Sequence, residues 1–453
     1  MIESADFPRS ISGAQAARLG ALIDAHAARV GVIGLGYVGL PLAMATARAG
    51  FPTSGFDIDH EKVAALGQGQ SYIDAVPATS LGEEIAAGRF GASADMRLLE
   101  RCDVIVICVP TPLSRNREPN LAYVEATTRQ IAETLRRGQL VVLESTTWPG
   151  TTEEVVIPIL EETGLICGKD FFVGFSPERE DPGNASFHTR NIPKVVAGHG
   201  DDARQMVEAF YSAVVANTVA VSTTATAEAV KITENVFRAV NVALVNELKV
   251  IYEAMGIDIW EVIDAAATKP FGYMPFYPGP GLGGHCIPID PFYLTWRARE
   301  FGIATRFIEL AGEINHAMPG FVVARLEEAL DRHCGKALSR ARVLLVGMAY
   351  KKNVSDMRES PSLELMERVT RRGCSVDYHD PHVPEVPPTR EYTVLAGRRS
   401  VSLDRLDDYD AVLIATDHDT IDYGAIADSA RLVVDTRNAM ERRGLVVRQL
   451  VKA

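Results

Sequence analysis

The sequence has no long uninterrupted run of apolar residues. No stretch of the 453-residue chain approaches the roughly 18 apolar residues needed to span a bilayer. The segment from Met1 to Asp6 also lacks the pattern of a secretion signal. We therefore expect a soluble, cytoplasmic protein that does not bind a membrane.

Cysteine and positive charge are also scarce. The six cysteines include no pair separated by two residues, which argues against a zinc site and a disulfide framework. The motif from Tyr378 to His382 offers no third ligand, so we expect no bound metal. Acidic residues outnumber basic ones by 59 to 46, and the net charge of −13 disfavours nucleic acid as a partner.

The chain is long enough for two or three domains. Apolar runs alternate with helical patterns from Arg29 onward, which predicts parallel sheets covered by helices. A helical pattern continues from Thr224 to Met255, and Gly256 is placed to end it. We predict an α/β fold with two Rossmann-like, doubly wound parallel-sheet domains joined by a long central helix. The predicted boundaries are 1–28 for an N-terminal helical extension, 29–222 and 331–453 for the sheet domains, and 223–330 for a central helical domain.

A glycine-rich turn follows the first apolar strand. Its three glycines have the spacing of a dinucleotide fingerprint, which permits a tight turn, close approach of a pyrophosphate and packing of helix on strand. Asp57 ends the next strand, where a carboxylate binds the adenosine ribose and repels a 2′-phosphate, so we predict NAD rather than NADP. The predicted cofactor residues are Gly34, Gly36, Tyr37, Val38, Gly39, Asp57, Lys62, Pro110, Thr111 and Thr147.

A second strand and turn, from Ala341 to Gly347, resembles the segment from Ala28 to Gly34. It has Ala349 and Lys352 where the first unit has its second and third glycines. Because those glycines admit the dinucleotide pyrophosphate, we expect the second unit to bind a different ligand.

Cys286 lies in a loop rich in glycine and proline, from Pro278 to Pro291. A free cysteine is commonly a small buried hydrophobe, but so many glycines beside a thiol suit the close approach of a ligand. Since the same chain carries a dinucleotide fingerprint, we interpret Cys286 as a nucleophile that traps an aldehyde for further oxidation.

Other polar residues are placed to assist such chemistry. Lys231 and Asn235 are four residues apart in the long helical pattern, so they share one helix face. An ammonium and an amide N–H together stabilise an alkoxide or an oxyanion. Asp290 is expected to orient a water or to pair with Lys231, and Glu178, just beyond a strand, is a candidate acid or base.

Together these motifs resemble the UDP-glucose and GDP-mannose dehydrogenase family, from about residue 28 to the end of the chain. The segments Ser176 to Asn184, Ile192 to Val195 and Pro270 to Pro275 are similar to the branch that acts on UDP-N-acetylglucosamine. UDP-glucose enzymes usually carry a lysine immediately before the aspartate that follows the cysteine, whereas this chain has Ile289. The missing charge favours an acetamido group over plain UDP-glucose.

The resemblance implies two successive NAD-dependent oxidations at C6 of a UDP-sugar, for surface polysaccharide synthesis, by a homodimer or higher homo-oligomer. It implies that Cys286 holds a thiohemiacetal and then a thioester, which water hydrolyses. The implied catalytic residues are Cys286, Lys231, Asn235, Asp290, Glu178 and Thr147. The implied substrate residues, some of them in the C-terminal UDP-sugar-binding domain, are Glu178, Arg179, Lys231, Asn235, Gly283, Gly284, Lys351 and Arg358.

Three alternatives remain open. The first is the same chemistry on UDP-N-acetylmannosamine, UDP-N-acetylgalactosamine, UDP-glucose or GDP-mannose. The second is a single oxidation of the 3-hydroxyacid dehydrogenase type, which needs no thiol. The third is a nucleotide-sugar sensor without catalysis.

Overall fold

The computed structural model describes residues 13–73, 75–114, 118–179, 191–284, 287–389 and 392–453. The chain divides into two compact units, which are described separately. The first comprises Met1–Glu234 and Phe292–Ile303, and the second comprises Asn235–Pro291 and Ala304–Ala453.

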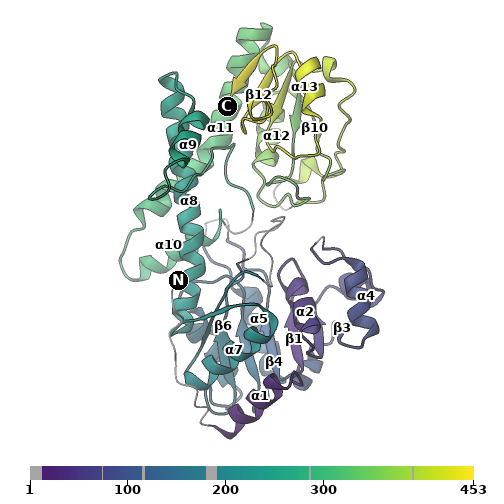
Figure 1. Cartoon of the computed structure of the whole chain (residues 1–453), viewed down its shortest axis with the longest axis vertical. Coiled ribbons are helices and arrows are strands. Elements are labelled where there is room, and N and C mark those ends of the chain that lie inside the picture. Colours follow the sequence, from purple (N-terminus) through teal and green to yellow (C-terminus); the bar gives the residue numbers. More distant parts are fainter. Residues whose placement is uncertain (1–12, 74, 115–117, 180–190, 285–286, 390–391) are drawn as a thin grey trace. The chain divides into compact units, whose positions relative to one another are not determined.

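The first unit is built on an eight-stranded sheet in the order β3-β2-β1-β4-β5-β6-β7-β8 (Figure 1). Neighbouring strands are parallel except β6 and β7, which are antiparallel. The strand order reverses between β1 and β4, and ligands of such sheets bind where the strands on either side of a reversal end. The strands are β1 (Val30–Ile33), β2 (Thr53–Phe56), β3 (Phe90–Ser93), β4 (Val104–Ile107), β5 (Leu140–Leu143), β6 (Phe172–Phe175), β7 (Lys194–Gly198) and β8 (Thr218–Ala220).

Helices cover both faces of this sheet. Side chains alternate between the faces of a strand, and Val104 and Val106 share one core with residues of α1, α2 and α7, while Ile105 and Ile107 are buried on the other face. The helices of this unit are α1 (Ala14–Asp24), α2 (Gly39–Arg48), α3 (His60–Gly67), α4 (Ala78–Ala86), α5 (Ala122–Ala132), α6 (Ile157–Glu161), α7 (Asp201–Val214) and most of α10 (Asp290–Glu300).

The second unit contains a five-stranded parallel sheet in the order β10-β9-β11-β12-β13. Leu345 and Leu413 pack in one core with residues of α11 and α12, and Leu344 and Val412 pack in another with residues of α13. The strands are β9 (Arg342–Val346), β10 (Ser375–His379), β11 (Ala411–Ile414), β12 (Val433–Asp435) and β13 (Leu450–Lys452). The helices are α9 (Ile259–Ala267), α11 (Arg306–Cys334), α12 (Pro361–Arg371) and α13 (Tyr423–Ser429).

The long helix α8 spans Thr224–Ala254 and belongs to the first unit up to Glu234 and to the second thereafter (Figure 1). The predicted fold class, with two doubly wound domains joined by a long helix, is confirmed. The predicted N-terminal helix is α1, which buries Leu19 and Ile23 in the core of the first unit.

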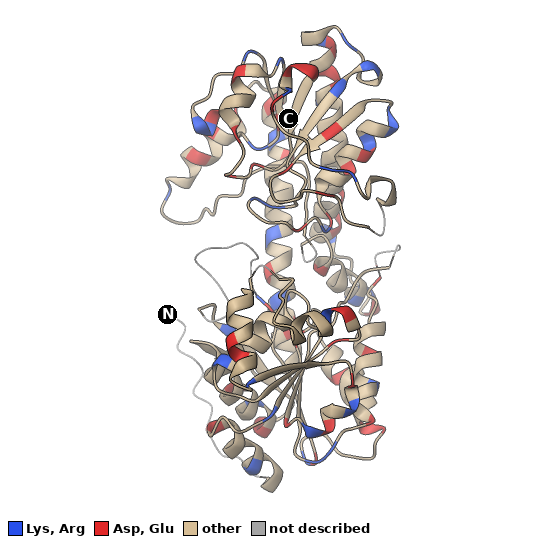
Figure 2. Cartoon of the chain, turned by 90° about the vertical axis from the view of Figure 1, so that its right-hand side faces the viewer, with Lys and Arg blue, Asp and Glu red and all other residues tan. Residues whose placement is uncertain are grey.

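Charge is mixed over both units. Figure 2 shows acidic and basic segments interspersed, with no large region of one sign in that view. Among the helices that the structure describes, none has the length and apolar character needed to cross a membrane.

Candidate functional site

The predicted glycine turn has the geometry that its sequence requires. Gly34 directly follows β1 with a φ of +92°, a conformation that favours glycine. A Cβ atom at Gly39 would lie 1.8 Å from the carbonyl oxygen of Gly34, so only glycine lets α2 begin there. No atom lies within 4 Å of the corresponding position at Gly36. The turn is therefore tight where it packs and open where a pyrophosphate approaches the N-terminus of α2.

Asp57 follows β2 and is held by the backbone. Its Oδ2 accepts a hydrogen bond from Leu35 N at 2.9 Å, and its Oδ1 accepts one from Asp59 N at 2.9 Å. A carboxylate has about four acceptor positions, so capacity is left for two ribose hydroxyls. Lys62 lies with Nζ 3.9 Å from Asp57 Oδ2, near enough to contribute its charge to the same site. These residues fit NAD.

The corresponding carboxylate of the second unit, Asp380 after β10, is saturated. Its Oδ2 accepts hydrogen bonds from Met348 N at 2.6 Å and from Ala349 N at 3.0 Å. The same oxygen lies 3.0 Å from His418 Nε2. Its Oδ1 accepts from His382 N at 2.7 Å and from a further amide. This carboxylate has no acceptor position left for a ribose, which explains why the second unit is not a second dinucleotide site.

Two segments follow strands beside the fingerprint. Thr147, after β5, is buried, and its Oγ1 has no hydrogen-bond partner among the described residues. A buried hydroxyl without a partner is costly unless a ligand or water satisfies it. After β4, Pro110 is exposed and Thr111 O accepts a hydrogen bond from Tyr293 Oη at 2.7 Å. Tyr37, in the fingerprint itself, is 39% exposed, and Val38 caps α2.

Lys231, on α8, is buried and donates a hydrogen bond to the main-chain carbonyl of Glu178. Next to Glu178, Arg179 Nη2 lies 2.6 Å from Glu234 Oε1, and Arg179 Nη1 donates to Pro193 O at 2.6 Å. The structure therefore brings together three of the predicted substrate residues. The sequence predicted these residues but not their contacts.

A buried charged network beside Glu178 was not predicted. Lys194, the first residue of β7, has Nζ 2.9 Å from Glu144 Oε2 and 3.8 Å from Glu178 Oε2. Tyr211, on α7, donates a hydrogen bond to Glu144 Oε1. Burial raises the pKa of Glu144 against the attraction of Lys194, while the two carboxylates raise the pKa of Lys194 despite its burial. The sequence feature that could have revealed this network is Lys194, because it begins a strand of otherwise apolar residues.

In the second unit, Asn235 Nδ2 donates a hydrogen bond of 2.6 Å to Asp290 Oδ2, and both residues are buried. Sequence reasoning paired Asp290 with a water or with Lys231, whereas the structure places Asn235 against it. A carboxylate that accepts from the amide fixes which way the amide points.

The glycine-rich loop is anchored on both sides. Gly279 N donates to Asn246 Oδ1 at 3.0 Å. Gly284 has a φ of +81°, and its N–H donates to Arg358 O at 3.1 Å. A Cβ atom at Gly283 would lie 2.7 Å from Tyr350 Cβ. The predicted nucleophile Cys286 lies outside the described residues, between these glycines and Asp290.

The predicted substrate residues after β9 are charged and partly exposed. Arg358 donates to its neighbour Asp356, with Nη2 2.6 Å from Oδ2. Lys352 Nζ lies 2.6 Å from Asp419 Oδ1, and Lys351 is its neighbour in the same turn. Through Gly284, the backbone of this segment contacts the cysteine loop.

The five described cysteines are all free. Burial raises the pKa of each, to about 12 for Cys102 and Cys167 and to about 11 for Cys374. Because the thiolate is the nucleophile, burial disfavours the reactive form of these thiols. No group of three metal-ligating side chains occurs within the described ranges.

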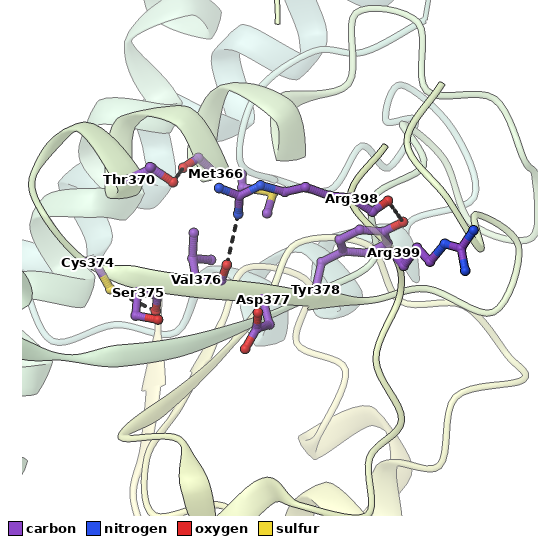
Figure 3. A pocket seen from close by; sticks show the side chains of 9 residues that line it. All are labelled: Met366, Thr370, Cys374, Ser375, Val376, Asp377, Tyr378, Arg398 and Arg399. Carbon is purple, nitrogen blue, oxygen red and sulfur yellow. Dashed lines mark hydrogen bonds between the residues drawn. The ribbon is translucent and has the colours of Figure 1, made fainter. Parts of the chain in front are cut away.

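A cavity of about 390 Å³ lies at the outer edge of the second sheet. Figure 3 shows Arg398 reaching across β10 to the carbonyl of Val376, at 3.0 Å. The lining contains none of the predicted site residues. The cavity is therefore separate from the predicted nucleotide-sugar residues after β9.

Three domains of one family together match most of the chain. The NAD binding domain of the UDP-glucose/GDP-mannose dehydrogenase family matches residues 28–215, its central domain matches 225–317, and its UDP binding domain matches 344–442.

Individual relatives match over similar lengths. The chain is 36% identical to a UDP-N-acetyl-D-glucosamine 6-dehydrogenase of Pseudomonas aeruginosa, over 86% of this chain and 90% of the relative. It is 34% identical to a UDP-N-acetyl-D-mannosamine dehydrogenase of Pyrococcus horikoshii, over 91% and 96%. The solved structure of the UDP-D-ManNAc dehydrogenase from Pyrococcus horikoshii matches with a TM-score of 0.82, 34% identity and the same coverage, 91% and 96%.

The open fingerprint turn, the free acceptor positions of Asp57 and the three matched domains agree with one another. The chain belongs to the UDP-glucose/GDP-mannose dehydrogenase family and is an NAD-dependent oxidoreductase.

Proposed function

We propose that this enzyme oxidises C6 of a UDP-N-acetylhexosamine to the uronic acid. The preferred substrate in this proposal is UDP-N-acetyl-D-glucosamine. The similarity to a UDP-N-acetyl-D-glucosamine 6-dehydrogenase and the apolar Ile289 support this substrate. The observation that carries the proposal is the buried hydrogen bond from Asn235 to Asp290, in the same unit as the glycine-rich loop. It presents an amide and a carboxylate, the groups that an alcohol oxidation and a hydrolysis need.

We propose Cys286 as the nucleophile. Bound NAD supplies the hydride acceptor for each of two oxidations. The Cys286 thiolate adds to the C6 aldehyde, whose oxygen takes a proton, to form a thiohemiacetal. Loss of a hydride and a proton then leaves a thioester. Water hydrolyses the thioester to the carboxylate and frees the thiol.

The other residues manage protons and charge in this scheme. Lys231 and Asn235 share one face of α8 and stabilise the negative oxygen at C6 as the alcohol, and later the adduct, loses its proton. Asp290 orients the amide of Asn235 and then assists the hydrolytic water, together with Glu178. Thr147, whose buried hydroxyl has no protein partner in the described part of the chain, donates to the ligand.

Substrate binding uses cationic groups. Arg358 and Lys351 bind the UDP diphosphate, for which a guanidinium and an ammonium are suited. Gly283 and Gly284 keep the loop next to Arg358 without side-chain bulk. Arg179, held by Glu234, adds a positive charge beside Glu178.

We also propose a homodimer formed through α8. Phe237, Leu244 and Ile251 are exposed by 49%, 49% and 46%, and their spacing of seven residues places them in one stripe along the helix. A second copy of the same stripe is its natural partner, since a repeated apolar seam pairs with itself. A Leu244→Arg variant is expected to sediment as a monomer at concentrations where the parent protein is a dimer. An unchanged dimer would contradict this interface.

This reaction suits a cytoplasmic enzyme that supplies an acidic sugar nucleotide for surface polysaccharide. The test is a panel of UDP-N-acetylglucosamine, UDP-N-acetylmannosamine, UDP-N-acetylgalactosamine, UDP-glucose and GDP-mannose, with NADH absorbance and uronic acid measured for each. We expect the highest kcat/KM with UDP-N-acetylglucosamine. No NADH from any sugar would indicate a sensor, and preference for another sugar would replace the substrate but keep the chemistry.

A further inference from the structure

Three buried polar side chains meet behind Glu178 in the first unit. Glu144 follows β5, Lys194 begins β7, and Tyr211 lies on α7. The Glu144 side chain is fully buried and that of Lys194 is 6% exposed. Lys194 Nζ lies 2.9 Å from Glu144 Oε2, and Tyr211 donates to the other oxygen of the same carboxylate. The segment after β5, strand β7 and helix α7 thus each contribute one group to the network.

Stability alone does not account for this network. Taking an ion pair out of water costs several kcal/mol per ion, and apolar replacements of similar volume are often neutral or stabilising. Lys194 does have a second neighbour, however, because its Nζ is 3.8 Å from Glu178 Oε2. One ammonium therefore faces two carboxylates, one fully enclosed and one that is 14% exposed.

Glu178 is consequently held at both ends. Lys231 donates to its main-chain carbonyl, and Lys194 attracts its carboxylate. The first contact fixes the backbone after β6, and the second limits the directions that the carboxylate takes. Together the two contacts hold Glu178 just beyond the end of β6.

We propose that Lys194 is a positioning residue for Glu178, with Glu144 and Tyr211 holding its ammonium in place. This inference rests on the proposed function, in which Glu178 assists hydrolysis. Lys194 itself touches neither the sugar nor the cofactor in this account. It acts only through the carboxylate that it orients.

A double-mutant cycle tests this role. We would measure kcat, with both substrates saturating, for Glu178→Gln, Lys194→Met and the combination. Lys194→Met is expected to lower kcat roughly 10- to 100-fold, as small misplacements of a reacting group do. In the Glu178→Gln background the same change is expected to cost little more, since it no longer has a carboxylate to orient. Equal losses in both backgrounds would overturn the proposal.

Further variants separate positioning from folding. Lys194→Arg keeps the charge and is expected to restore most of the activity, and Tyr211→Phe removes one hydroxyl and is expected to lower kcat several-fold with the KM for NAD unchanged. Lys194→Met with Glu144→Gln leaves no unpaired buried carboxylate, so it is expected to fold and still to be impaired. Wild-type kcat in that folded variant would contradict the proposal.

A matched control is Arg89→Met, which removes the 2.7 Å partner of buried Glu84 elsewhere in the first unit. It is expected to leave kcat unchanged. A Glu178→Gln enzyme with full activity would instead contradict the role of Glu178 in the proposed function. Independent losses from Glu178→Gln and Lys194→Met would contradict only the positioning.

Discussion

Asn235 and Asp290 are 55 residues apart in the chain, yet Asn235 Nδ2 donates a hydrogen bond of 2.6 Å to Asp290 Oδ2. The carboxylate accepts a hydrogen bond from one N–H of the amide and so fixes the orientation of the amide. A carboxamide has a second N–H, which is left to serve a substrate oxygen. Two predicted catalytic residues are thus joined in one buried pair.

Breaking this pair is expected to slow the reaction. Asn235→Ala removes an oxyanion donor, and such losses lower kcat by about 100- to 1,000-fold. Asp290→Asn keeps the volume but loses the acceptor charge, so we expect a loss of at least about 10-fold. Steady-state kinetics with UDP-N-acetylglucosamine measure both. Thr233→Ala changes an exposed position on the same helix turn and is the control, which is expected to retain full activity. An unchanged kcat in Asn235→Ala would refute the role of the amide.

Asp57 is expected to determine the choice of cofactor. Asp57→Asn removes the charge that repels a 2′-phosphate and weakens two hydrogen bonds to ribose, each worth about 1.5–3 kcal/mol when the acceptor is charged. The KM for NAD is expected to rise roughly 10-fold or more, and NADP is expected to become a better substrate relative to NAD. Asp59→Asn, at the N-cap of α3, provides the comparison. An unaltered NAD/NADP ratio in Asp57→Asn would be inconsistent with this assignment.

Glu228 links stability to pH. It is buried on α8 and accepts hydrogen bonds from Gly150 N at 2.5 Å and from Thr152 N at 2.9 Å. Burial raises its pKa from 4.5 to about 7, so the folded state binds the proton more tightly than the unfolded state. Stability from this group is therefore present below pH 4.5 and is lost as the pH rises through 7.

A Glu228→Gln variant should lose this dependence. As the pH rises from 5 to 8, the Tm of the variant is expected to increase by several degrees relative to the Tm of the parent protein. The exposed Glu162→Gln is expected to show no such trend. Parallel Tm curves for Glu228→Gln and the parent protein would show that this carboxyl does not titrate in that range.

The cysteine loop requires glycine at position 284. Its φ is +81°, and a Cβ atom there would lie 2.9 Å from Tyr350 Cε2. Gly284→Ala is therefore expected to cost at least about 1 kcal/mol of unfolding free energy and to lower kcat. Gly82→Ala, within α4 and with no atom within 4 Å, is expected to gain about 0.5–1 kcal/mol instead. Urea unfolding measures the free energy of unfolding of both variants. Equal free energies would contradict the steric requirement for glycine at position 284.

The sequence predicted the local parts of this account well. The glycine turn, the strand end at Asp57 and α8 depend on short-range rules of backbone conformation and periodicity, and the structure confirms their positions. The family and the cofactor are also confirmed. These features need no knowledge of distant contacts.

Contacts between distant residues were harder to predict. Lys194 was visible only as part of a motif, because no local pattern reveals which carboxylates of other strands will surround it. The same holds for the pair of Asn235 and Asp290, which lie 55 residues apart. From the sequence, Asp290 was expected to contact a water or Lys231 instead. The cysteine nucleophile remains a prediction from sequence.

We propose that this one enzyme removes four electrons from C6 through a covalent intermediate on Cys286. The most direct measurement is the number of NADH formed per UDP-N-acetylglucosamine consumed, with the product identified, for the parent protein and for Cys286→Ser. We predict two NADH and the uronic acid for the parent protein, and failure of Cys286→Ser to complete the second oxidation. One NADH per sugar, or full four-electron turnover by Cys286→Ser, would contradict the account.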